Sequence, residues 1–350
     1  MEAPLLNDTV SVGGELLILA ALPRARAPPR WRALTESEAQ EVVEARDRVS
    51  RTLCLSEVGF AQPLSFRRSE IPRLLGSRFL VALKTDGERC QLFLTTLGAL
   101  PRAFLIFRSK KVVEVEFEAC NLLFAGTLLD GEMVIDRTET VFLVFDGYIA
   151  RGKAIDKLAY TARHAAIQAL MPQMRFAPQS RIELRVKTLS PAPLCASVWR
   201  HRLTAAHLND GLIFTQEMGT QCFKWKHLAS VDVLVKRGED TPFVRKGSEL
   251  MPLVHLRLGG KSVSHPIQAL PANALTTAYF HTHQEAQHVV LEVFVEKIEK
   301  ETGPTLRLVP VRLRLDKSTP NHIHTAAEAA LAAVEGVTVE ELAERLREQR

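Results

Sequence analysis

The chain has 350 residues and a mass of 39.0 kDa, which is enough to bury a full core and to form two domains. Hydrophobic residues make up 46% of it and charged residues 24%, as is ordinary for a globular protein. The formal net charge of +5 suits a polyanionic partner, and it suits a plain excess of surface arginine equally well. No run of about 18 apolar residues occurs, so we expect no membrane span.

The cysteines are odd in number and form no CxxC pair, which indicates a reduced intracellular protein without a structural zinc site. They are Cys54, Cys90, Cys120, Cys195 and Cys222. Residues 1–20 contain an apolar patch but no basic leader, so they do not resemble a signal peptide.

The N-terminal part contains one predicted helix. Residues 21–32 are rich in proline and arginine and are typical of an extended or loosely ordered segment. Thr35 and Glu38 then form a potential capping box, and a helix is predicted from there to about Arg51.

Strand-like runs dominate residues 78–144, and a helix over residues 156–171 follows them. The predicted strands are FLVALK (79–84), CQLFLTTL (90–97), AFLIF (103–107), KVVEVEF (111–117), LLDGEMVI (128–135) and TVFLVFD (140–146). The continuous apolar runs indicate strands that are covered on both faces.

After Lys226 the pattern changes to alternating strands with short turns, which predicts a small antiparallel barrel. These strands are SVDVLVK (230–236), LVHLRLG (253–259), HVVLEVFVEK (288–297) and TLRLVPVRLRL (305–315). Two helices end the chain, the second with Thr338 as N-cap. We therefore predict four regions. They are an N-terminal extension with a helix (1–60), a first domain (61–226), a barrel domain (227–321) and C-terminal helices (322–350).

The most informative residue is Lys84, which ends the apolar strand 79–83 and is followed by Asp86, Gly87 and Arg89. A lysine has a normal pKa of about 10.4, so it becomes a nucleophile only if burial and neighbouring positive charge remove its proton. Lys84 is therefore a candidate nucleophile, and nearby cations are expected to help depress its pKa.

Similar charged breaks occur elsewhere in apolar strands, and each alone has a plainer interpretation as a turn or as exposed alternation. They are Asp130 with Glu132, Phe142 with Asp146, Asp210, and Lys224 with Lys226. Together they fit a nucleoside triphosphate with magnesium, because cations bind phosphate and carboxylates bind the metal or the ribose. We expect the ring of Phe142 to stack on the base and Phe145 to lie in the core.

These segments resemble the ordered motifs of the covalent nucleotidyltransferases, and among them the guanylyltransferases of mRNA capping. The matching segments are KTDGER (84–89), LLDGEMV (128–134), FLVFD (142–146), NDGLIF (209–214), CFKWKH (222–227) and RLDKSTPNH (314–322). The resemblance implies an α+β fold. It consists of an ATP-grasp-like nucleotidyltransferase domain with antiparallel sheets and flanking helices, and a C-terminal OB-fold barrel that acts as a lid.

The resemblance also implies residue roles. Lys84 attacks the α-phosphorus of GTP and becomes lysyl-GMP. The other implied catalytic residues are Asp210, Asp316, and Lys224 and Lys226, which would grip the α-phosphate. The implied nucleotide-binding residues are Arg89 and Glu132, which would hold the ribose, and Arg108, Phe142, Arg314 and Lys317. Asp210 and Glu132 are the implied ligands of Mg²⁺ or Mn²⁺. Phe107 precedes Arg108 where the family usually has aspartate.

The implied activity is GMP transfer from GTP to the 5′-diphosphate end of RNA. A separate RNA triphosphatase, a cap methyltransferase and RNA polymerase are the implied partners, with no membrane. The expected location is the nucleus, or a viral factory or the cytoplasm if the chain is viral. Two alternatives stay open: an ATP-dependent RNA or DNA ligase of the same superfamily, and an inactive relative that only binds RNA.

Overall fold

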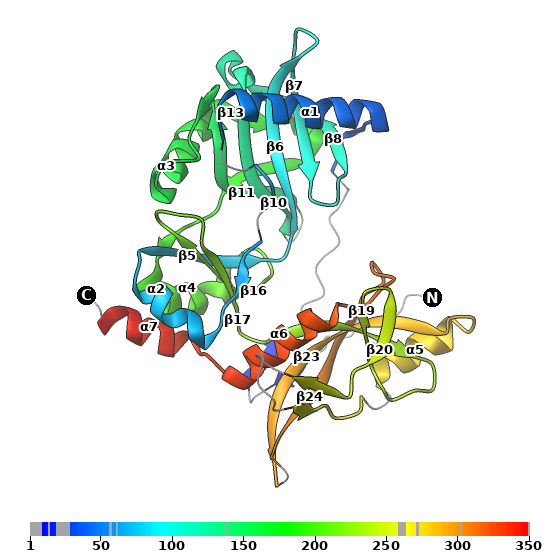
Figure 1. Cartoon of the computed structure of the whole chain (residues 1–350). Coiled ribbons are helices and arrows are strands. Elements are labelled where there is room, and N and C mark those ends of the chain that lie inside the picture. The colour runs from blue at the N-terminus through cyan, green and yellow to red at the C-terminus, as the bar shows by residue number, and fades with distance from the viewer. Residues whose placement is uncertain are drawn as a thin grey trace. The chain divides into compact units, whose positions relative to one another are not determined.

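The structure is a computed structural model, and it divides the chain into two units (Figure 1). It describes residues 9–12, 15–18, 29–55, 58–60, 62–136, 139–257, 264–270, 273–301 and 303–348. The larger unit comprises residues 20–64, 73–225 and 342–350, and the smaller unit comprises residues 1–19, 65–72 and 226–341.

Two sheets form the larger unit. The main sheet has the order β12 (Lys153–Ala154), β11 (Glu139–Ala150), β10 (Thr127–Asp136), β6 (Glu88–Leu97), β7 (Leu100–Phe107), β8 (Val112–Val115) and β3 (Arg32–Ala33), and β14 (Ile182–Val186) runs parallel to β11. The second sheet has the order β15 (Ser190–Pro191), β5 (Phe79–Thr85), β16 (Asn209–Gln216), β17 (Cys222–Lys226) and β4 (Leu64–Ser65). A further strand pair joins β9 (Phe117–Ala119) to β13 (Met174–Phe176).

The helices of the chain are short apart from the first. They are α1 (Glu36–Thr52), α2 (Ile71–Leu75), α3 (Tyr160–Leu170), α4 (Cys195–Arg200), α5 (Ala274–Thr282), α6 (Ile323–Glu335) and α7 (Val339–Glu348). Short 3-10 helices cover Arg68–Glu70, Asn121–Ala125, Met171–Gln173, Pro178–Ser180, Ala192–Leu194 and His201–Thr204. No helix among the described residues is long and apolar enough to cross a membrane.

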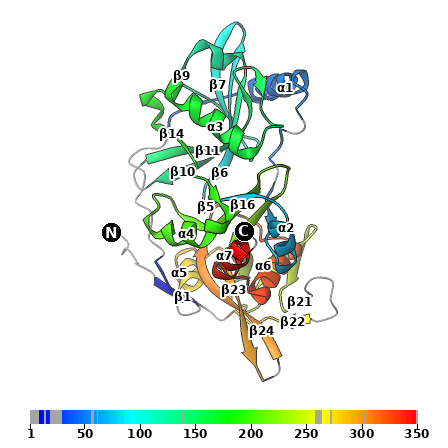
Figure 2. The ribbon, with the colours of Figure 1, turned by 90° about the vertical axis from the view of Figure 1, so that its left-hand side faces the viewer.

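The main sheet is covered on both faces, which explains its continuous apolar strands. On one face, Leu92 and Leu94 pack in a cluster with Ile167 of α3. On the other face, Phe93 packs in a cluster with Val42 of α1. The two helices lie on opposite sides of the sheet in Figures 1 and 2. Each fully buried side chain of this size contributes about 1.5–3 kcal/mol, so both layers stabilise the sheet.

The predicted start of α1 is confirmed in detail. The Thr35 side chain accepts a hydrogen bond from the backbone of Glu38, and the Glu38 carboxylate accepts one from the backbone of Thr35. The helix ends at Thr52, one residue beyond the predicted end. Of the proline- and arginine-rich segment 21–32, residues 21–28 lie outside the described part of the chain.

The smaller unit is built on an antiparallel sheet in the order β20 (Glu249–Pro252), β19 (Phe243–Lys246), β18 (Ser230–Lys236), β23 (His288–Lys300) and β24 (Gly303–Leu313). Two strand pairs accompany it, namely β1 (Thr9–Val12) with β2 (Glu15–Ile18) and β21 (His255–Arg257) with β22 (Ser264–Pro266). Helix α6 packs Ala326 and Ala330 into the same core as Val233 and Leu291.

The α+β class is confirmed, and most predicted strands are present. One predicted run, residues 111–117, is wrong as a single strand. It breaks at Glu116, because β8 pairs with β7 of the main sheet whereas β9 pairs with β13. The second tail helix begins as predicted, since the backbone of Glu341 donates to Thr338 Oγ1 at 3.1 Å. Closure of the smaller unit's sheet into an OB-type barrel stays a prediction.

Candidate active site

Lys84 and Asp210 meet where β5 and β16 pair irregularly. Lys84 lies opposite Gly211 and Thr85 lies opposite Asn209, so Asp210 is an extra residue that the ladder leaves out. Such a bulge re-aims a side chain. Here the Lys84 Nζ lies 2.6 Å from Asp210 Oδ1. The Lys84 side chain is 21% exposed, so the predicted nucleophile is shielded but reachable.

A second set of charged side chains, Glu132 and Lys187, meets at Thr85, the residue that follows Lys84. The Thr85 hydroxyl donates to the Glu132 carboxylate, and Lys187 Nζ donates to Thr85 Oγ1 at 3.0 Å. Lys187 Nζ also lies 3.5 Å from Glu132 Oε2. Burial lowers the pKa of Lys187, and the charge of Lys84 acts in the same direction, whereas Glu132 opposes both. Glu132 thus contacts a hydroxyl and an ammonium group, and its predicted roles toward metal and ribose stay predictions.

Lys187 is a candidate site residue that the sequence alone does not single out. It directly follows β14, and its backbone nitrogen donates to the carbonyl of Val144 at 2.7 Å. Its backbone carbonyl contacts His164 Nε2 at 2.7 Å. In the sequence it is one cation among many, and only its burial in the fold distinguishes it.

Arg89 is held by a buried carboxylate. Its Nε and Nη2 donate to Asp130 at 3.1 and 2.7 Å, and the Tyr148 hydroxyl donates to the same carboxylate at 3.0 Å. Burial raises the pKa of Asp130, while the guanidinium of Arg89 and the hydroxyl of Tyr148 favour its charged form. Burial also disfavours the charged form of Arg89, yet Asp130 raises the pKa of Arg89 above its usual value. We therefore treat the two as an ion pair.

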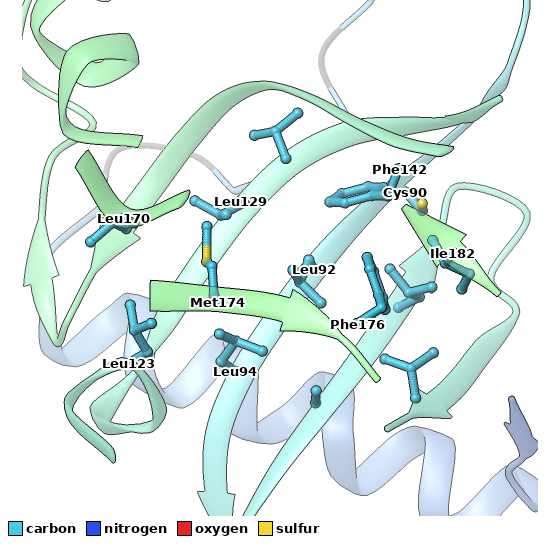
Figure 3. Packing of buried hydrophobic residues seen from close by; sticks show 14 of the residues in the cluster. Cys90, Leu92, Leu94, Leu123, Leu129, Phe142, Leu170, Met174, Phe176 and Ile182 are labelled. Atoms are coloured by element: carbon cyan, nitrogen blue, oxygen red, sulfur yellow. The ribbon is translucent and has the colours of Figure 1, made fainter. Parts of the chain in front are cut away.

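The structure contradicts the predicted stacking role of Phe142. The structure buries this residue completely, in the core cluster that also contains Cys90 and Phe176 (Figure 3). Its ring meets that of Phe176 edge-on at 6.2 Å, and a Cβ on Gly131 would lie 2.7 Å from it. No base can stack on a ring enclosed in this way, so the predicted stacking role of Phe142 is wrong in this structure.

Phe145, predicted to lie in the core, is instead half-buried beside the charged groups. The Arg89 guanidinium lies 5.4 Å from its ring centre, and Lys187 Nζ lies 5.6 Å from it. The ladder between β10 and β11 pairs Asp130 with Asp146 and Gly131 with Val144, which leaves Phe145 out as the extra residue of a bulge. Regular alternation along this strand predicted Phe145 in the core and Phe142 at the nucleotide, whereas the structure buries Phe142 and leaves Phe145 half-buried.

Arg108 is exposed at the turn after β7, and its backbone nitrogen donates to the carbonyl of Arg89 at 3.0 Å. In the amide orientation that satisfies its hydrogen bonds, Gln62 accepts from the Arg108 guanidinium, with a distance of 3.1 Å to Nε. The structure thus brings the backbones of two predicted nucleotide-binding arginines together. Their contacts with a nucleotide stay predictions.

Lys224 and Lys226 lie two residues apart on β17, so they project from the same face of the strand. Both are half-buried, and Lys226 Nζ donates to Ser230 Oγ at 3.2 Å. Their predicted contact with the α-phosphate stays a prediction.

The last group of predicted residues belongs to the smaller unit, where it gathers around Asp232. Arg314 Nη1 donates to Asp232 at 3.1 Å, Lys317 Nζ donates to the same carboxylate, and Asn321 Oδ1 accepts from the Asp232 backbone at 2.8 Å. Arg314 also pairs with Asp316 at 2.7 Å and lowers the pKa of Asp316 to about 2. No role was predicted for Asp232, yet its buried carboxylate organises this motif.

Replacing Asp232 by asparagine is expected to destabilise the smaller unit. Removing one partner of a buried pair costs about 3–5 kcal/mol. Because Arg314 and Lys317 are partly exposed and can hydrate, we expect about 1–2 kcal/mol here. The measurement is the urea midpoint of the full chain. Asp316→Asn is the matched control, since Asp316 is mostly exposed and its pair is worth about 0–1 kcal/mol. Equal shifts for both variants would contradict the organising role of Asp232.

The predicted metal ligands can be tested against the donor set. No group of three His, Cys, Asp or Glu residues that could enclose a metal occurs among the described residues. Mg²⁺ in nucleotide enzymes is typically held by one or two carboxylates and by substrate phosphates. Asp210, whose carboxylate contacts Lys84 Nζ, is chemically suited to be such a metal ligand. Glu132 has the right chemistry but already contacts Thr85 and Lys187.

A pocket of about 640 Å³ lies elsewhere in the larger unit and is lined in part by Trp31, Arg102, Glu114 and Phe117. None of the predicted site residues line it. The predicted site residues Lys84, Glu132 and Asp210 lie instead on β5, β10 and β16.

Comparison with known proteins agrees with the motifs. Residues 32–227 match the family model described as "mRNA capping enzyme, catalytic domain". The chain is 25% identical over 236 residues to the mRNA-capping enzyme subunit alpha of Schizosaccharomyces pombe, which covers 55% of this chain and 57% of that protein. The chain thus spans little more than half the length of this relative.

Solved structures that are similar include one titled Pmar-Lig_Pre, at 11% identity and a TM-score of 0.36, which covers 77% of this chain and 71% of that one. Another is a Chlorella virus DNA ligase-adenylate, at 12% identity and a TM-score of 0.31, which covers 73% of this chain and 99% of that one.

Proposed function

This chain belongs to the family of mRNA capping enzyme catalytic domains, and on that premise we propose that it is an mRNA guanylyltransferase. It transfers GMP from GTP to the 5′-diphosphate end of RNA through a covalent intermediate on Lys84. The observation that carries the proposal is the pairing of Lys84 Nζ with Asp210 at 2.6 Å, at a strand bulge of the larger unit.

In the first half-reaction, the amine of Lys84 attacks the α-phosphorus of GTP. A P–N bond forms, the bond from the α-phosphorus to the bridging oxygen breaks, and pyrophosphate leaves with that oxygen. The ammonium proton must leave before attack, and Asp210 is the carboxylate in contact with it. Arg89 and Arg108 bind the ribose and phosphate of the nucleotide, while Lys224 and Lys226 neutralise the α-phosphate.

A divalent cation, Mg²⁺ or Mn²⁺, would be held by Asp210 together with phosphate oxygens, and Glu132 is the second candidate ligand. When bound, it supplies positive charge that stabilises the phosphates in the transition state. Arg314, Asp316 and Lys317 are proposed to act on the β- and γ-phosphates. For this, Arg314 and Lys317 must exchange the carboxylate of Asp232 for phosphate oxygens.

The preference for GTP over ATP is supported by the pair Thr85 and Lys187. An ammonium group can only donate hydrogen bonds. Guanine presents a carbonyl oxygen, O6, where adenine presents an amino group, which is itself a donor. We propose that the buried Lys187 ammonium donates a hydrogen bond to guanine O6, a contact that the adenine amino group cannot accept, and so favours guanine over adenine. The half-buried ring of Phe145 replaces Phe142 as the proposed aromatic neighbour of the nucleotide.

In the second half-reaction, a terminal phosphate oxygen of the RNA 5′-diphosphate attacks the phosphorus of lysyl-GMP. The P–N bond breaks, a phosphoanhydride bond forms, and Lys84 regains its proton. The net charge of +5 favours association with the RNA end. A triphosphatase must supply this diphosphate, and a cap methyltransferase and RNA polymerase are the further proposed partners. The nucleus is the proposed location, or a viral factory or the cytoplasm for a viral chain.

The proposal is tested by incubating the protein with α-labelled GTP or ATP and magnesium. We expect covalent labelling by GTP that survives denaturation and is reversed by pyrophosphate. Labelling by ATP alone would favour the ligase alternative, and labelling by neither nucleotide would favour an inactive RNA-binding relative. Transfer of the label to RNA ending in a 5′-diphosphate, but not to RNA ending in a monophosphate, checks the acceptor.

A further inference from the structure

The residues just before Leu64 are tied to the predicted nucleotide site by backbone hydrogen bonds. The carbonyl of Val58 accepts from Gln91 Nε2 at 2.8 Å, and Gln91 is fully buried on β6. The Tyr148 hydroxyl oxygen, whose proton goes to Asp130 at 3.0 Å, also lies 3.4 Å from the carbonyl oxygen of Gly59. Gln91 also accepts from Arg46 of α1 at 3.2 Å, so the N-terminal helix and this segment share one anchor.

Two side chains of the same segment contact the two predicted nucleotide-binding arginines. The ring centre of Phe60 lies 5.6 Å from the guanidinium carbon of Arg89. Gln62 accepts from the guanidinium of Arg108. The described residues 58–60 and 62 therefore reach both arginines within a few positions of the chain.

The surroundings of Arg89 show why such contacts matter. Asp130 fixes one edge of its guanidinium, and the rings of Phe60 and Phe145 both lie within 5.6 Å of its guanidinium carbon. A cation close to the face of an aromatic ring is attracted by it, and more strongly when the cation is shielded from water. The arginine side chain is 19% exposed, so this shielding is substantial.

We propose that Phe60 and Gln62 are positioning residues, which hold Arg89 and Arg108 in the geometry that binds GTP. The proposal rests on the function proposed above. It makes Phe60, which the sequence placed in the N-terminal extension of residues 1–60, part of the catalytic site together with Gln62 of the predicted first domain. Catalytic side chains must be held close to the productive geometry by neighbours that restrict their rotamers.

The test measures the initial rate of protein–GMP formation against GTP concentration. Phe60→Leu keeps an apolar side chain but removes the ring, and we expect the KM for GTP to rise about threefold to tenfold. The maximal rate changes less, because the nucleophile is untouched. Gln62→Ala is expected to raise the KM about twofold to fivefold. Phe60→Tyr retains an aromatic ring, so its KM for GTP should equal that of the wild type. Leu64→Ala is the control, since Leu64 is 60% exposed near the same segment.

Double variants distinguish positioning from simple packing. In an Arg89→Ala background, Phe60→Leu should raise the KM no further, and the same holds for Gln62→Ala in an Arg108→Ala background. An unchanged KM in the single variants, or an additive effect in these backgrounds, would overturn the proposal. Labelling of the wild type by ATP would overturn only the choice of GTP as the nucleotide. The single and double variants would then be compared with ATP as the substrate. Labelling by neither nucleotide would overturn both proposals.

Discussion

Lys84→Ala is expected to abolish covalent labelling by GTP completely. The P–N bond of the intermediate requires this amine, because Lys84 is the lysine of the KTDGER segment that resembles the nucleophile motif. The fold should survive, since the Lys84 side chain is partly exposed and its partner Asp210 is 41% exposed and can hydrate. The measurement is the label retained on the denatured protein.

Lys153→Ala is the matched control for this experiment, because Lys153 is an exposed lysine of the same unit. It should label like the wild type. Thermal unfolding of Lys84→Ala should stay within a few degrees of the wild type, since changes at partly exposed pairs are worth about 0–1 kcal/mol. A Lys84→Ala protein that still acquired label from GTP would remove the nucleophile assignment.

Lys187→Met is expected to weaken the preference for GTP over ATP by about tenfold to a hundredfold, because hydrogen bonds from charged groups contribute about 1.5–3 kcal/mol. Methionine keeps most of the buried volume but donates no hydrogen bond. Removal of the ammonium also takes a cation from Glu132, so labelling by GTP should fall. The measurement is the ratio of the labelling efficiencies for GTP and ATP.

The same residue should leave a signature in the pH dependence. Burial lowers the pKa of Lys187, and its ammonium is the proposed donor to guanine. The GTP preference is therefore fully present below this lowered pKa and is lost as the pH rises through it. In Lys187→Met the preference should not change with pH over the same range. A wild-type ratio of GTP to ATP labelling that is independent of pH up to 10.5 would contradict this role.

Local patterns in the sequence predicted much of the fold. Apolar runs gave most strands of the main sheet, and the capping box at Thr35 gave the start of α1, because these signals act between residues close in the chain. The end of strand 79–83 likewise predicted Lys84 as the candidate nucleophile. The motif order also identified the family, since the spacing of charged breaks is visible without coordinates.

The choice between Phe142 and Phe145 could not be made in this way. Alternation assumes a regular ladder, whereas the pairing of β10 with β11 leaves out Phe145 and, farther along, Tyr148. The pairing of β5 with β16 leaves out Asp210 in the same manner. A bulge depends on how two strands pair, whether they are consecutive like β10 and β11 or far apart in the chain like β5 and β16. A pattern within one strand therefore does not contain it.

The sequence by itself determined which residue types stand at the strand ends and, through them, the family. The tertiary structure alone decided which charges are buried together. It pairs Arg89 with Asp130, Lys187 with Glu132 and Thr85, and Arg314 with Asp232. A charge is costly to bury without a partner, and the partners here are brought together by packing between separate strands. That is why burial and pairing, which set the chemistry of each group, emerge only once the sheets are assembled.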